Sequence, residues 1–129
     1  MRKISFVNYC FITIIFAACS YHKADVAYPR ATTCDTTIVR YSVEVVSILN
    51  NNCKDCHFGN SAISGINLFN WQTIHAYATD GKHTYGTLLS AVLHQGGAPK
   101  MPLRNPPVKI SQCDIDKLTA WVNRGALNN

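Results

Sequence analysis

The chain has 129 residues, and its 12 Lys and Arg against 7 Asp and Glu give a formal charge of +5. This length allows one domain with a modest core, which is marginal without a disulfide, a metal or a cofactor. The basic residues that follow Lys3 are scattered singly instead of forming a stripe, and this distribution argues against nucleic acid as a partner.

Residues 1–18 have the features of a secretory signal peptide. Arg2 and Lys3 precede an apolar run, Phe6 to Ala18, which is shorter than the roughly 20 residues that span a membrane. The chain is therefore expected to be exported. Removing the segment leaves a charge of +5 − 2 = +3.

The end of this segment, Phe16-Ala17-Ala18-Cys19-Ser20, resembles a bacterial lipobox. In that motif a cysteine behind small residues receives lipid and becomes the mature N-terminus. Phe16 stands where the motif usually has Leu, so ordinary cleavage near Ser20 is the alternative. We expect lipidation at Cys19 and attachment to a bacterial membrane on its periplasmic side.

Residues 19–37 are predicted to form a flexible tether. From Tyr21 the composition is polar, includes Pro29 and shows no periodicity. The folded domain is expected to cover residues 38–129.

The first element of this domain is ambiguous. Val39, Tyr41, Val43 and Val45 alternate as in a strand, and β-branched residues favour one there. Ser42 could instead cap a helix that presents Val45, Val46 and Leu49 on one face. Local propensity alone favours the strand.

The next segment, Cys53-Lys54-Asp55-Cys56-His57, has the pattern C-x-x-C-H. In this pattern each thiol adds across a haem vinyl group, and the adjoining histidine binds the iron as an axial ligand. The pattern therefore predicts one covalent haem c, held by Cys53, Cys56 and His57.

Two alternatives for this motif are weaker. A tetrahedral zinc site needs four ligands, and here Cys34 and Cys113 would have to come from opposite ends of the chain. A redox dithiol of the thioredoxin type needs a βαβ context, which nothing in the sequence indicates.

Three helices are predicted after the motif. One starts at Asn70 and carries Trp71, Ile74 and Ala78. The next lies in "TYGTLLSAVLHQGG", with Tyr85, Leu88, Leu89, Val92 and Leu93 on one face and two glycines at its end. The last starts at Ser111, presents Ile115, Leu118, Trp121 and Val122, and stops at Gly125.

The order of these elements resembles a class I c-type cytochrome. The likeness covers about Cys34 to Ala126 and rests on C-x-x-C-H, "SGINLF", a Met-Pro loop and the helix start "SQCDI". It implies an all-α fold of about four helices around one haem. In that fold the segment before the motif is helical and crosses the last helix, so the resemblance overrules the strand for Ser42 to Asn52. The expected crossing partners are Leu118 and Trp121 against Val45, Val46 and Leu49.

The resemblance also implies a sixth iron ligand. In the family a methionine beside a proline binds the iron opposite the motif histidine, and Met101-Pro102 matches. Met101 is the single methionine after the signal segment. A lone methionine is more often core filler, and His75, His83 and His94 are the competing ligands.

One departure from the family concerns the orientation of His57. Class I cytochromes often have a proline shortly after the motif, whose neighbouring carbonyl orients the imidazole. None occurs between Phe58 and Leu68, so a backbone carbonyl from Asn60 to Gly65 is expected to serve instead.

The remaining cysteines, Cys34 and Cys113, are expected to form a disulfide, because export makes unpaired thiols improbable. The whole pattern predicts an electron carrier that is not an enzyme by itself and exchanges single electrons with redox protein partners. Two further possibilities remain open. One is a haem module for gas or peroxide with a weak or open sixth position, and the other is an exported domain stabilised by zinc.

Overall fold

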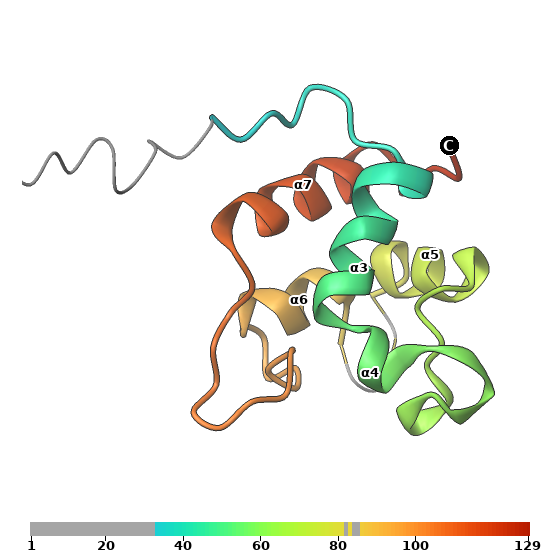
Figure 1. Cartoon of the computed structure of the whole chain (residues 1–129), viewed down its shortest axis with the longest axis vertical. Helices are drawn as coiled ribbons and strands as arrows, with labels where there is room; N and C mark the ends of the chain where they lie inside the picture. The colour runs from blue at the N-terminus through green and yellow to red at the C-terminus, as the bar shows by residue number, and fades with distance from the viewer. Residues whose placement is uncertain (1–32, 82, 84–85) are drawn as a thin grey trace, which may run out of the picture. The chain divides into compact units, whose positions relative to one another are not determined.

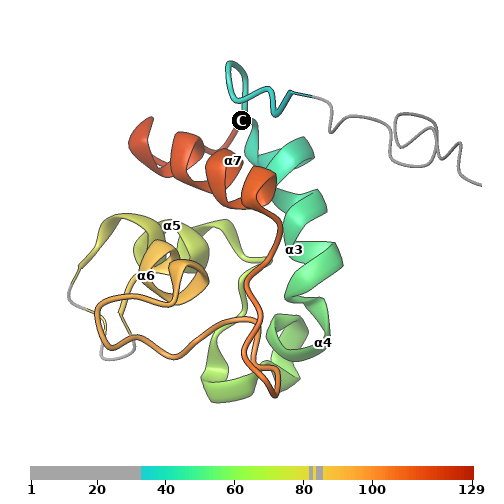
Figure 2. The same ribbon diagram turned by 90° about the vertical axis from the view of Figure 1, so that its left-hand side faces the viewer.

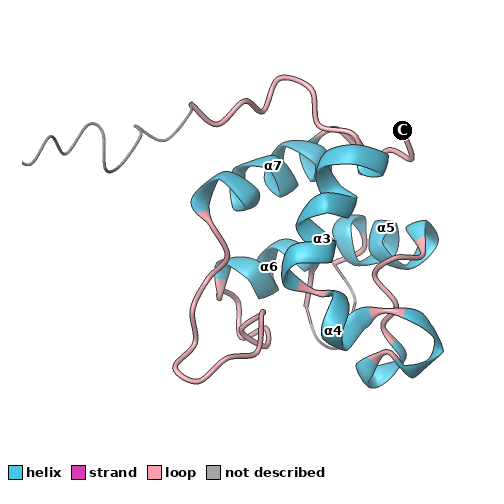
Figure 3. Ribbon diagram, viewed as in Figure 1, coloured by secondary structure: helices cyan, strands magenta, loops and turns pink. Residues whose placement is uncertain are grey.

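The computed structural model describes residues 33–81, 83 and 86–129. Across these residues the structure consists of helices and loops, with no strand (Figure 3). The elements in chain order are η1 (Tyr41–Val45), α3 (Val46–Asn52), α4 (Lys54–His57), η2 (Gly59–Ser61), η3 (Ile63–Gly65), α5 (Trp71–Thr79), α6 (Leu88–Leu93) and α7 (Gln112–Asn123). For the described part of the chain, the all-α prediction is confirmed.

The segment before the C-x-x-C-H motif is helical, because η1 and α3 follow one another directly. Val45 is fully buried whereas Val43 is 47% exposed, although alternation in a strand would place both on one face. Tyr41, Ile48 and Leu49 are buried with Val45, at the spacing of one helix face. The helix expected for Ser42 to Asn52 is therefore confirmed. The strand that local propensity alone favours is wrong, since tertiary burial selects the helical period.

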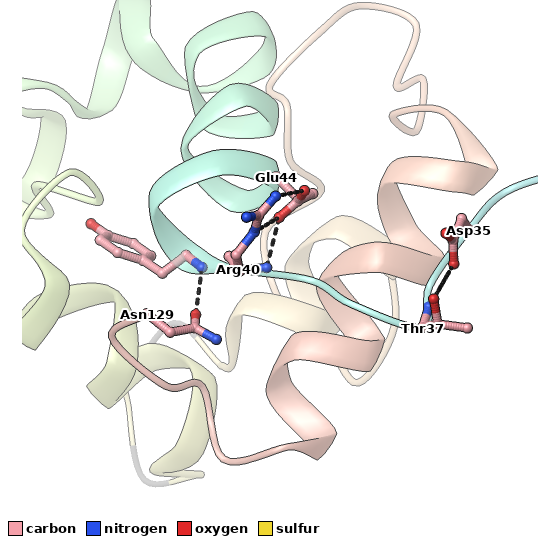
Figure 4. Close-up of polar contacts among 6 residues, drawn as sticks. Asp35, Thr37, Arg40, Glu44 and Asn129 are labelled. Atoms are coloured by element: carbon pink, nitrogen blue, oxygen red, sulfur yellow. Dashed lines mark hydrogen bonds and ion pairs between the residues drawn. The ribbon is translucent and has the colours of Figure 1, made fainter.

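Polar contacts stabilise the start of η1 (Figure 4). The carboxylate of Glu44 accepts a hydrogen bond of 2.7 Å from the backbone N–H of Arg40 and forms an ion pair with its guanidinium at 3.2 Å. The hydrogen bond from the Arg40 guanidinium is the larger cause and that from the Arg40 backbone N–H the smaller, and together they hold the pKa of Glu44 below its usual 4.5. Asn129 accepts from the N–H groups of Tyr41 and Ser42, so residues from both ends of the described chain meet here.

The helices α5 and α6 have side-chain caps. Asn70 Oδ1 accepts from the N–H of Thr73 at the start of α5, as the sequence predicts. Thr87 and Ser90 form a capping box at the start of α6.

The predicted end of α6 at the two glycines is wrong. His94 already takes a left-handed conformation, with φ 57° and ψ 45°, and ends the helix before Gly96. Tyr85, which the sequence assigns to this helix, lies outside the described residues.

The last helix, α7, begins as predicted, with Ser111 Oγ accepting from the N–H of Asp114. Figures 1 and 2 show it at one end of the helix formed by η1 and α3, with α4 at the other end. The ring of Trp121 stacks on Tyr41 at 5.9 Å between centroids. Helix α7 packs against η1, so the crossing lies nearer Tyr41 and Val45 than Leu49.

A disulfide joins Cys34 to Cys113 at the start of α7, as the sequence predicts. Near the other end of α7, the guanidinium of Arg124 donates to the Thr36 carbonyl at 2.8 Å. Residues 34–36 are thus attached to α7 at two points, although the sequence analysis places them in the tether.

The predicted signal segment, the lipidation site Cys19 and most of the predicted tether lie outside the described residues. Within the described part of the chain, none of the helices has both the length and the hydropathy needed to cross a membrane.

Candidate functional site

A cavity of about 260 Å³ lies beside the C-x-x-C-H motif. Its walls come from the end of α3, α4, the loop that follows, α5, the start of α6 and the loop before α7. The lining side chains are largely aliphatic and include Ile63, Ile66, Leu68, Leu88, Val92 and Leu103. The same cavity is lined by Cys53, Cys56, His57 and Met101, so the fold brings together all four residues that the sequence assigns to a haem.

The imidazole of His57 is held by the loop that follows it. Its Nδ1 lies 2.9 Å from the carbonyl oxygen of Ile66. A carbonyl can only accept, so Nδ1 carries the proton and the lone pair of Nε2 is free to bind a metal. The backbone carbonyl of His57 also accepts from the N–H of Leu68 at 3.1 Å. Both contacts fix the ring and its backbone relative to the loop.

The expectation that a carbonyl from Asn60 to Gly65 orients His57 is wrong by one residue. Ser64 and Gly65 both have positive φ, 57° and 69°, and they turn the chain immediately before Ile66. The sequence shows a glycine at this turn, but the left-handed conformation of Ser64 has no signal in the sequence.

The two thiols of the motif differ in environment. Cys53 joins α3 to α4 and is half-buried, whereas Cys56 lies within α4 and is exposed. Burial, together with the neighbouring Cys56, raises the pKa of Cys53 to about 11, so at neutral pH Cys53 is a neutral thiol. Neither cysteine takes part in a disulfide.

Met101 lies in the loop between α6 and α7, and its peptide is anchored on both sides. The Met101 N–H donates to the carbonyl of Ala91 at 3.1 Å. The Met101 carbonyl lies 3.1 Å from Nε2 of His94. The loop position of the methionine, which the sequence predicts, is thus fixed against the end of α6.

Among the described histidines, only His57 lines the cavity. The ring of His75 packs on Trp71 at 4.8 Å between centroids, and the ring of His83 stacks on Tyr77 at 3.9 Å. His94 is hydrogen-bonded to the Met101 carbonyl, and none of the three competing ligands lines the cavity.

Several polar residues of the lining are missed by the sequence analysis. They are Asn52, Asp55, Tyr77, Thr87 and Arg104. Asn52 and Arg104 lie close to the motif and to Met101 in the sequence, which is the one signal that could have found them. Tyr77 and Thr87 reach the cavity through the packing of α5 and α6.

The donor set of the cavity fits a c-type haem. It provides two thiols at the C-x-x-C spacing, an imidazole with a free Nε2, a thioether and apolar walls. In the part of the chain that the structure describes, no three His, Cys, Asp or Glu side chains come together as a ligand set for a metal ion.

Comparisons with protein-family models, curated proteins and solved structures find no match to this chain. The residues of the cavity are therefore the basis for a functional proposal.

Proposed function

We propose that this protein is a mono-haem c-type cytochrome of class I that carries single electrons between redox protein partners. The observation that carries the proposal is the convergence on one apolar cavity of the C-x-x-C-H motif and Met101, with His57 oriented through its Nδ1. A haem c bound there supplies one-electron transfer between Fe(III) and Fe(II).

Each residue of the motif has a distinct part in this proposal. Cys53 and Cys56 would hold the porphyrin through thioether bonds, and His57 would bind the iron through Nε2. The hydrogen bond from Nδ1 to the Ile66 carbonyl fixes the tautomer that iron binding requires. It also makes Nε2 a stronger electron-pair donor to the metal.

Met101 would supply the second axial ligand. Its thioether is neutral and soft and favours the reduced iron. Aliphatic side chains of Ile66, Leu68 and Val92 line the cavity, and apolar walls beside the iron would also disfavour its more highly charged oxidised form.

Two observations favour haem over the other cysteine chemistries. A four-ligand zinc site would need Cys34 and Cys113, but these are bonded to one another. A nucleophilic cysteine of a redox dithiol has a lowered pKa, whereas burial raises that of Cys53 to about 11.

A haem module for gas or peroxide differs from an electron carrier in whether Met101 binds the iron. The two hydrogen bonds that anchor the Met101 peptide support a permanent ligand. If His57 and Met101 both bound the iron, no position would remain for a substrate, so we propose a carrier and not an enzyme.

Optical spectroscopy of the purified protein tests the axial ligands. The oxidised protein should show the weak far-red band of iron-sulfur ligation, and Met101→Ala should abolish it. Val108→Ala, in the same loop at a residue that is 51% exposed, is the matched control and should keep the band. A wild-type spectrum without the band would exclude Met101 as a ligand.

A haem stain on a denaturing gel tests the covalent link. The wild type should stain, because thioether bonds survive denaturation, and the double variant Cys53→Ala, Cys56→Ala should not. The control Cys34→Ala, Cys113→Ala removes two cysteines outside the cavity and should keep the stain. A wild type without stain that contains zinc would support the zinc-stabilised domain instead.

We also propose that the protein is exported and attached to a bacterial membrane through lipid on Cys19. Support comes from the lipobox-like sequence and from the disulfide, which persists in oxidising compartments. In cell fractionation, Cys19→Ser should move the haem-stained protein from the membrane to the soluble fraction. Equal membrane retention of both forms would exclude the lipid anchor.

A further inference from the structure

His94 occupies a backbone conformation that does not favour a histidine. It ends α6 with φ 57° and ψ 45°, in the left-handed region that glycine adopts freely and that other residues adopt at a cost. Helices commonly end with glycine at such a position, and the chain has glycines two and three residues later, at Gly96 and Gly97. The histidine side chain is therefore expected to contribute something that a glycine could not.

The side chain contacts the candidate ligand loop. Nε2 of His94 lies 3.1 Å from the carbonyl oxygen of Met101. Because a carbonyl only accepts, Nε2–H is the donor. The backbone N–H of Met101 donates to the carbonyl of Ala91, which lies in α6. The two hydrogen bonds fasten Met101 to the end of α6 from both sides.

The geometry points to His94 as a positioning residue that holds Met101 at the cavity, an inference that rests on the proposed function. A thioether is a weak, neutral ligand on a flexible side chain. Its binding to the iron is therefore tighter when its loop is already ordered and loses less conformational entropy on binding. Between His94 and Met101 the chain turns at Gly96 and Gly97, with φ of 63° and 74°, and the N–H of Ala98 donates to the Gln95 carbonyl. The hydrogen bond from His94 supplies a constraint without touching the iron.

The variant His94→Gly separates positioning from a merely structural role. Glycine suits the left-handed helix end, so the helix itself should be no less stable. The Met101 carbonyl, however, loses its donor. Imidazole added to the oxidised haem-loaded protein competes with the thioether for the iron, and its affinity should rise about fivefold, the effect of one lost hydrogen bond. The far-red band should also disappear at a lower temperature than in the wild type.

Gln95→Ala is the matched control, because Gln95 is exposed and is the next residue in the same loop. It should leave imidazole affinity at the wild-type value. In a Met101→Ala background, His94→Gly should cause no further rise, because His94 acts through Met101. A further rise there would mean that His94 affects the site by another route and would overturn the inference.

Unchanged imidazole affinity and unchanged thermal loss of the band in His94→Gly would also overturn the inference, while leaving the proposed function intact. The proposed function itself fails on a different result, a wild type without haem or without the far-red band. If His94→Gly does not fold, His94→Asn gives the same test. Asparagine tolerates the left-handed region, and its side chain is shorter than that of histidine, so the same rise in affinity is expected.

Discussion

A substitution at Gly86 tests how tightly the residues beside the cavity are packed, because the space around this glycine leaves no room for a Cβ. It lines the cavity just before α6 and has φ +79°. A Cβ there would lie 2.8 Å from Ser90 Oγ and 2.9 Å from the Cβ of Ala98. Ser90 Oγ cannot move aside freely, since it donates to the Thr87 carbonyl and accepts from the Thr87 N–H.

The magnitude for Gly86→Ala follows from two costs. The left-handed backbone costs a residue with a Cβ about 1–2 kcal/mol, and overpacking adds about 1–3 kcal/mol. Gly97→Ala is the matched control, because Gly97 has a similar φ of +74° and nothing lies within 4 Å of the position that an added Cβ would take. The control should show the backbone cost alone.

The assay is thermal unfolding of the haem-loaded protein, followed by circular dichroism. The two variants should differ by about 1–3 kcal/mol, or about 5–20 °C in Tm for a domain of this size. Ala98→Gly in the Gly86→Ala background removes one of the two clashes and should recover part of the loss. Equal Tm values for Gly86→Ala and Gly97→Ala would refute the steric argument.

Three further predictions concern the rest of the domain. The double variant Cys34→Ser, Cys113→Ser opens a link across 79 residues and should lose about 4 kcal/mol in the chain-entropy model, measured by urea unfolding; an unchanged midpoint would contradict it. Trp121→Ala, at a residue that is 1% exposed and donates to the Leu127 carbonyl, should cost about 3–5 kcal/mol, and a loss below about 1 kcal/mol in the same assay would contradict the burial. The folded pKa of Glu44 lies below its unfolded value of 4.5, so its stabilising effect is present above that pH and is lost as the pH falls through the folded pKa. Glu44→Gln should therefore be less stable than the wild type at about pH 6, and this difference should shrink as the pH falls below the unfolded value and through the folded pKa; a Tm difference that does not change with pH would exclude this linkage.

The sequence by itself predicted the ligand residues of the candidate site. The C-x-x-C-H spacing is local, so Cys53, Cys56 and His57 could be recognised without any fold. The helix starts at Asn70 and Ser111 and the periodic faces of α5 and α7 are equally local, and the structure has them where the sequence predicts them.

Tertiary structure decided the features that depend on contacts between distant segments. The β-branched run before the motif is helical because one helical face is buried against α7, with Tyr41 stacked on Trp121, and local propensity carries no information about that partner. The carbonyl that orients His57 depends on a turn made by a left-handed serine, and the anchoring of Met101 depends on where α6 ends. Backbone conformations and hydrogen bonds of this kind are set by packing, so the sequence could name the residues of the site but not the atoms that position them.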